Sequence, residues 1–216
     1  VVLFTMSQAV ADDISEPIKG KTSDISCEEV KMLVILDRSG SMDTRVHGTR
    51  PIRQAREAVV MVAELMEPGD YLGLVVFNDK AKVTVDLTPN SRKEVADEAR
   101  GMKAEGGTSF NAGLRKAVHA IEDASARGVH VVFISDGDDR DRLRNTYIRR
   151  LQDLDVHLNT IATGREANHK KLKDLSSRFG GWSLRVQHSS LKSTLAEMVN
   201  EARCQCTVAD IRDVIR

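Results

Sequence analysis

Three side-chain oxygen donors follow the first apolar segment of the chain at alternating positions. Residues 32–36 are all apolar, and the chain continues with Asp37, Ser39 and Ser41. A short apolar segment that ends at a carboxylate predicts a strand buried on both faces of a parallel sheet. Alternate positions of an extended or gently turning loop point the same way, so we expect these side chains on one side. A carboxylate with two hydroxyls is half of a site for a hard cation such as Mg²⁺, Ca²⁺ or Mn²⁺, in preference to Zn²⁺ or Cu²⁺.

Two later segments offer the other half of such a site. Thr108 follows Gly106 and Gly107 at the expected start of a helix, and Asp136 ends a second apolar strand. In a doubly wound α/β sheet, ligands bind outside the carboxyl ends of the strands, where the loops of neighbouring strands diverge. We therefore expect Asp37 and Asp136 at that edge, with Thr108 between them. Gly107 is expected to let the backbone pass close to the site.

These segments match the motif of a known family in order and in structural context. Over about residues 31–203 the chain resembles von Willebrand factor type A domains, including integrin I domains. The resemblance rests on the family's metal-ion-dependent adhesion site (MIDAS), which here reads Asp37-Arg38-Ser39-Gly40-Ser41, Gly106-Gly107-Thr108 and Ser135-Asp136-Gly137.

The resemblance implies an adhesion-type, non-catalytic function. The family's metal ion accepts an Asp or Glu carboxylate from a partner protein; Mg²⁺ is the default ion, with Ca²⁺ or Mn²⁺ as alternatives. In integrin-type relatives the counterpart of Asp136 is a direct ligand in the closed form and that of Thr108 in the open form, coupled to a sliding last helix. The implied metal ligands form a complete MIDAS: Asp37, Ser39, Ser41, Thr108 and Asp136.

The overall composition limits the classes of partner. The 32 Lys and Arg residues of this 216-residue chain balance its 32 Asp and Glu residues. This balance gives no net attraction for nucleic acid or anionic membranes, and no apolar segment is as long as a transmembrane helix. We predict a protein partner, no nucleic acid and no membrane insertion by this chain. The length fits one domain with tails: a polar tail or linker over 1–30, the domain over 31–203 and a short tail over 204–216. We expect this chain to be part of a larger protein.

Apolar periodicity predicts an alternation of strands and helices. The fold class is α/β: a doubly wound, mostly parallel, six-stranded Rossmann-like sheet with helices on both faces. The turn at 78–80 predicts a hairpin and hence one antiparallel edge strand. Ser91 or Asn90 is expected to cap the helix that follows. The predicted strands are 32–37, 71–77, 83–87, 129–135, 156–162 and 182–186, and the helices 51–66, 92–102, 109–126, 143–154, 168–178 and 190–203.

Other residues with reactive side chains receive no role in chemistry. The charged segment 138–142 is interpreted as a solvated loop, and the six histidines show no paired spacing. The three cysteines are interpreted as reduced or incidental thiols, which favours the cytoplasm. Cys27 precedes the first strand and Cys204 closes the last helix, so the two could meet. Some extracellular family members are tied in this way, and a disulfide at Cys27 would indicate an extracellular protein.

Three alternatives remain open at this stage. The chain could be an intracellular regulatory or substrate-adaptor domain, because it also resembles family members found beside zinc-finger ubiquitin ligase modules. It could be a Mg²⁺-dependent hydrolase of the haloacid dehalogenase type, although Ser39 occupies the position of that family's second Asp. The candidate oxygens could also only cap loops, or hold a metal that stabilises the fold.

Overall fold

A six-stranded sheet forms the centre of the molecule. The computed structural model describes residues 29–45, 48, 50–164, 167–185 and 191–214, with side chains described up to residue 203. The strand order is β3-β2-β1-β4-β5-β6. Only β2 and β3 pair antiparallel among the described strands. This arrangement confirms the predicted fold class. The strands are β1 (Lys31–Asp37), β2 (Tyr71–Phe77), β3 (Ala81–Pro89), β4 (His130–Ser135), β5 (His157–Ala162) and β6 (Ser183–Arg185).

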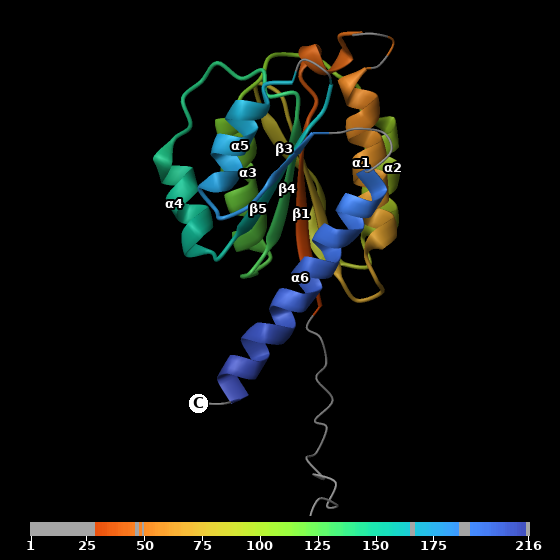
Figure 1. Cartoon of the computed structure of the whole chain (residues 1–216). Coiled ribbons are helices and arrows are strands. Elements are labelled where there is room, and N and C mark those ends of the chain that lie inside the picture. Colours follow the sequence, from red (N-terminus) through yellow and green to blue (C-terminus); the bar gives the residue numbers. More distant parts are fainter. Residues whose placement is uncertain (1–28, 46–47, 49, 165–166, 186–190, 215–216) are drawn as a thin grey trace, which may run out of the picture.

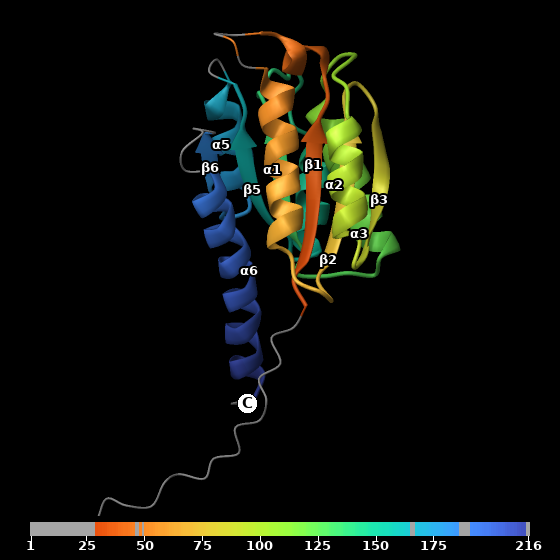
Figure 2. The same ribbon diagram turned by 90° about the vertical axis from the view of Figure 1, so that its right-hand side faces the viewer.

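Helices cover both faces of this sheet (Figures 1 and 2). One apolar core contains side chains of α1, α2 and α6, and the other contains side chains of α3, α4 and α5. A short 3-10 helix, η1 (Gly40–Asp43), follows β1 and had no counterpart among the predicted elements. The helices are α1 (Pro51–Leu65), α2 (Arg92–Gly101), α3 (Phe110–Asp123), α4 (Asn145–Asp153), α5 (His169–Ser177) and α6 (Leu191–Val214).

The central strands are buried on both faces, as their apolar composition predicts. In β1, Met32 and Val34 pack into the core beneath α1, while Leu33 and Ile35 pack into the core beneath α3. Beneath the carboxyl edge of the sheet, Phe110 lies 4.7 Å from the ring centre of Phe133 and 5.9 Å from that of Phe77. Packed aromatic rings of this kind give the loops above them a firm base.

The end of the last helix differs from the expectation. The helix α6 continues to Val214, so the predicted end at residue 203 was wrong. No Gly or Pro lies between Leu191 and Val214, and nothing in that segment therefore stops a helix. None of the helices in the described part of the chain is long and apolar enough to cross a membrane.

A buried ion pair fixes α6 at the amino edge of the sheet. The carboxylate of Asp70 accepts hydrogen bonds from the backbone of Val30 and Glu67 at 3.0 and 2.8 Å. Nη2 of Arg203, on α6, donates to Oδ2 of Asp70 at 2.8 Å. The start of β1 and the middle of α6 therefore lie together at the edge opposite the loops that follow β1 and β4, and α6 continues beyond that edge (Figure 1).

Two histidines meet at the same amino edge, although no spacing along the sequence indicated this contact. His130 and His157 occupy matched positions at the starts of β4 and β5. Their rings stack with centres 5.0 Å apart. Burial lowers the pKa of His130 from 6.5 to about 4, and the neighbouring His157 adds to this effect, while Asp155 opposes it.

Candidate metal centre

Asp37 is a buried carboxylate at the carboxyl end of β1. Its side chain is fully buried. Oδ1 accepts a hydrogen bond from the backbone N–H of Ser39 at 2.8 Å, and Oδ2 accepts one from the hydroxyl of Ser135 at 2.6 Å. Burial raises the pKa of Asp37 from 3.8 to about 6, against the lowering effect of these hydrogen bonds; the charge of Asp136 raises it further. The fold therefore holds a negative charge here at a cost in free energy.

The two serines of the first segment lie together beside Asp37. Ser39 is buried and Ser41 is half-buried, at the turn that begins η1. Their hydroxyl oxygens are 3.1 Å apart. Adjacent oxygen ligands of an octahedral Mg²⁺ lie about 3.0 Å apart, given metal–oxygen distances of about 2.1 Å. The spacing of the two hydroxyls therefore fits one edge of such a coordination shell.

Asp136 approaches the same region from β4. Its Oδ1 accepts from the backbone N–H of Asp138 at 3.0 Å, and its carbonyl oxygen accepts from the backbone N–H of Asn168 at 2.7 Å. Gly137 has φ +78°, and a Cβ atom there would lie 2.7 Å from the carbonyl oxygen of Asn168. The carboxylate is near enough to Asp37 to raise that residue's pKa. The fold thus brings the two carboxylates to one edge of the sheet.

Thr108 lies on a loop that is bonded to the first segment through the backbone. The N–H of Glu105 donates to the carbonyl oxygen of Arg38 at 2.7 Å, and the N–H of Gly40 donates to the carbonyl oxygen of Gly106 at 2.9 Å. Thr108 is half-buried directly before Ser109, which caps α3. Within the described part of the chain, no hydrogen bond joins the hydroxyl of Thr108 to the other four candidate side chains. Its loop is placed beside them, but its side chain is not bonded to them.

The glycine that permits this close approach is Gly106. Its φ is +80°, and a Cβ atom there would lie 2.7 Å from Nδ2 of Asn78. At Gly107 the nearest atom to such a Cβ would be the Asp79 Cβ, at an ordinary 3.6 Å. The expectation for Gly107 was therefore wrong by one position, because the tight contact is with the β2–β3 turn.

Two supporting residues did not receive a role from the sequence. Ser135 is fully buried and links Asp37 to the backbone N–H of Gly137, which donates to its hydroxyl at 2.9 Å. Asp139 is buried as well, so the interpretation of segment 138–142 as a solvated loop was wrong at this position. The Asp139 carboxylate accepts from the N–H of Phe110 at 3.2 Å and lies 3.4 Å from Nζ of Lys171. The only available signal for Ser135 was its place before Asp136.

The donor set contains oxygen atoms alone. Among the described residues, no three His, Cys, Asp or Glu side chains lie together in a way that could hold a metal. A site at this edge would therefore combine the two carboxylates with the hydroxyls of Ser39, Ser41 and Thr108. Oxygen donors with few carboxylates suit Mg²⁺, Mn²⁺ or Ca²⁺, and the residues present fit such an ion.

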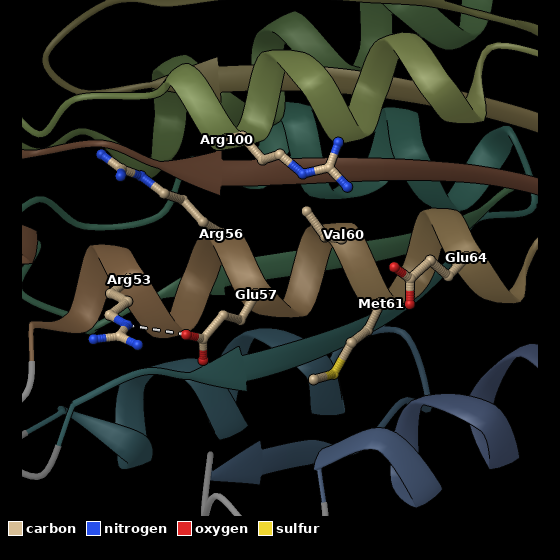
Figure 3. A pocket seen from close by; sticks show the side chains of 7 residues that line it. All are labelled: Arg53, Arg56, Glu57, Val60, Met61, Glu64 and Arg100. Atoms are coloured by element: carbon tan, nitrogen blue, oxygen red, sulfur yellow. Dashed lines mark hydrogen bonds and ion pairs between the residues drawn. The ribbon is translucent and has the colours of Figure 1, made fainter.

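A second concave surface lies away from this edge. A groove of about 350 Å³ runs along α1 beside α2, lined by Val60, Met61 and five charged residues (Figure 3). Two of these, Arg53 and Glu57, pair with each other at 3.1 Å on the helix surface. Because long charged side chains cover much of the groove, it resembles an ordinary helix surface more than a ligand site.

Comparison with known proteins supports one family. The model of the von Willebrand factor type A domain matches residues 32–138. Calcium-activated chloride channel regulator 1 from Bos taurus is 27% identical over 174 residues, which are 78% of this chain and 19% of that protein. The chain therefore spans about a fifth of the length of this relative.

Solved structures agree on the fold. A von Willebrand factor type A structure from Catenulispora acidiphila superposes with a TM-score of 0.64 at 21% identity, covering 83% of this chain and 42% of that one. Proximal thread matrix protein 1 from the mussel byssus, with a zinc-occupied MIDAS motif, has a TM-score of 0.64 at 16% identity, covering 82% of this chain and 48% of that one. The family match, the relative and these folds together support a von Willebrand factor type A domain.

Proposed function

We propose that the chain, whose family match and fold support a von Willebrand factor type A domain, is a protein-binding module that depends on a divalent cation. The cation, Mg²⁺ by default, is held by oxygens of Asp37, Ser39, Ser41, Thr108 and Asp136. It supplies a positive charge at the carboxyl edge of the sheet. A carboxylate of a partner protein completes its coordination, and the chain itself performs no catalysis.

The burial of Asp37 without a cationic partner carries this proposal. Its carboxylate is fully buried, and its described hydrogen-bond donors are a backbone N–H and a hydroxyl, both neutral. A second carboxylate, Asp136, lies close enough to disfavour the charged form. Buried charges in proteins are usually paired or bound to a metal. A divalent cation beside the Ser39 and Ser41 hydroxyls would balance this charge.

The chain's own residues account for the proposed affinity for a partner carboxylate. Two carboxylates formally balance the charge of a divalent ion, while three hydroxyls add no charge. If one carboxylate binds the ion only through a water molecule, the coordination position that faces solvent retains part of the ion's positive charge. An incoming Asp or Glu then forms a charge-assisted contact that chelation removes. The mussel protein with zinc at its MIDAS motif supports metal binding on this fold, at a site of a different protein.

The alternative function, a substrate-adaptor domain, differs from the proposed one only in the larger protein to which the domain would belong. Because the chain covers 19% of the length of the channel regulator, we propose that it works as one domain of a larger protein. An adaptor would use the same metal-dependent contact, so the first test is common to both versions.

Calorimetric titration of Mg²⁺ into chelator-treated protein tests the proposal. Wild-type protein should take up one ion, and Asp37→Ala should take up none. The matched control is Asp138→Asn, which removes an exposed acidic charge from the loop of Asp136. Wild-type protein that is folded but binds no Mg²⁺, Mn²⁺ or Ca²⁺ would refute the metal-dependent function. Binding that Asp37→Ala retains would place the ion elsewhere.

A further inference from the structure

The loop after β1 and the loop before α3 are joined side by side. Two backbone hydrogen bonds connect them, from Glu105 N–H to the Arg38 carbonyl oxygen at 2.7 Å and from Gly40 N–H to the Gly106 carbonyl oxygen at 2.9 Å. A Cβ atom on Gly40 would lie 3.2 Å from that Gly106 oxygen, so the two backbones are in close contact. One loop carries Ser39 and Ser41, and the other carries Thr108.

One ion pair spans the same junction. Nη2 of Arg38 contacts Oε1 of Glu105, so both residues take part in a side-chain and a backbone contact across it. The Arg38 side chain is 24% exposed, and its Nε is buried without a hydrogen-bond partner among the described residues. Glu105 is therefore the group that compensates the partial burial of the guanidinium. Without Glu105, the arginine side chain would gain by moving out to water.

We propose that Arg38 and Glu105 are a positioning pair, which fixes the Thr108 loop against the Ser39–Ser41 loop and so preorganises the hydroxyls of the candidate metal site. This inference rests on the proposed function, because its purpose is the metal site. The pair touches neither the ion nor the partner directly. The Glu105 side chain is 67% exposed, and exposed ion pairs contribute little attraction. The contribution of the pair lies in the order it imposes on two loops.

A positioning role and a purely electrostatic role predict opposite signs for one variant. Arg38 lies between Asp37 and Ser39 in the sequence. Arg38→Gln removes its positive charge from beside the candidate site, so simple electrostatics would make Mg²⁺ bind more tightly. Glu105→Gln removes a negative charge, so simple electrostatics would make it bind more weakly. A positioning pair instead requires that both substitutions weaken binding, since each one frees the loops.

Mg²⁺ titration of four variants distinguishes these cases. We expect Arg38→Gln and Glu105→Gln each to raise the Kd for Mg²⁺ about two- to fivefold. This change corresponds to the lower part of the range of interaction energies between residues in contact. The charge-swapped double variant, Arg38→Glu with Glu105→Arg, should recover part of this loss. The control is Arg50→Gln, which breaks the exposed ion pair with Asp43 at 3.0 Å outside the junction. Tighter binding by Arg38→Gln would overturn the positioning role.

Amide hydrogen exchange in chelator provides a readout that needs no metal. The N–H groups of Gly40 and Glu105 should lose protection in both single variants and regain part of it in the swapped variant, while amides in the middle of β1 stay unchanged. Unchanged exchange at Gly40 and Glu105 would overturn the inference even if metal affinity changed. If the wild type binds no metal, the proposed function fails, and the exchange rates still decide whether the pair fixes the loops.

Discussion

Asp37→Asn should stabilise the protein in chelator and destabilise it relative to wild type in Mg²⁺. Burial raises the pKa of Asp37 from 3.8 to about 6, so the folded state binds a proton more tightly than the unfolded state. As the pH rises from about 3.8 to about 6, the free energy of unfolding falls. Above about pH 6 the folded state holds a buried charge. Each pKa unit corresponds to about 1.4 kcal/mol. The substitution should therefore add up to about 3 kcal/mol to the free energy of unfolding at pH 7 without metal.

The amide can keep both hydrogen bonds of the carboxylate. Its oxygen accepts from the N–H of Ser39, and its NH₂ group donates to the hydroxyl of Ser135, which must then turn to another acceptor. Because that turn costs part of a hydrogen bond, the gain is an upper value.

Urea unfolding in chelator and in Mg²⁺ measures the difference in free energy of unfolding between variant and wild type under both conditions. Mg²⁺ at about 1,000 times its Kd adds about 4.1 kcal/mol to the wild type. This exceeds the variant's advantage of up to about 3 kcal/mol in chelator, and we expect no such gain from Mg²⁺ for the variant. Near pH 4 the advantage of the variant in chelator should shrink to about 0.5 kcal/mol, because the wild-type carboxyl group is then protonated. A variant less stable than wild type in chelator at pH 7 would refute the reasoning that Asp37 is held there against its own burial cost.

Three further predictions concern groups around the two edges of the sheet. Because burial lowers the pKa of His130 to about 4, the unfolded state binds its proton first. Stability should therefore be lost as the pH falls from about 6.5 toward 4, by up to about 3 kcal/mol, and pH-dependent unfolding of His130→Gln should show a smaller loss. Arg203→Met leaves Asp70 buried without its cationic partner and should cost about 3 kcal/mol in urea unfolding; an unchanged midpoint would show that the ion pair contributes nothing. Gly106→Ala should lower the melting temperature and weaken Mg²⁺ binding, since its φ is +80°, whereas Gly107→Ala, which makes ordinary contacts, should change both much less.

The sheet could be predicted from the sequence because its central strands are short apolar segments between loops. Tyr71–Phe77 matched its predicted strand exactly at both ends, since Gly69 and the turn at Asn78 mark those ends. The position of Asp37 and Asp136 at one edge of the sheet could be predicted by the same reasoning, because carboxyl ends of parallel strands share an edge. The ligand set itself stays a prediction.

Contacts between distant segments could not be predicted in the same way. The stacking of His130 on His157 depends on the register of two consecutive strands, which the helix α4 separates along the chain. The burial of Asp139 depends on Lys171 and on the backbone of Phe110, and no local pattern indicates either contact. The cap of α2 shows the same limit, because Ser91 donates its hydroxyl to the carbonyl oxygen of Thr88, at 2.9 Å, and makes no side-chain cap.

The start of β1 lies beside the middle of α6, and this helix continues past the edge of the sheet (Figure 1). This arrangement determines how the molecule should respond to mechanical force. A load applied between the start of β1 and the end of α6 would peel α6 away from the sheet one contact at a time, since it would not pull the parallel strands along one another. Arg203 is the last residue of α6 whose side chain is described, so its ion pair with Asp70 would be the first of the described polar contacts to bear the load. The loops of Asp37 and Asp136 lie at the far edge (Figure 1). We therefore expect tension to release α6 while these loops still keep their structure.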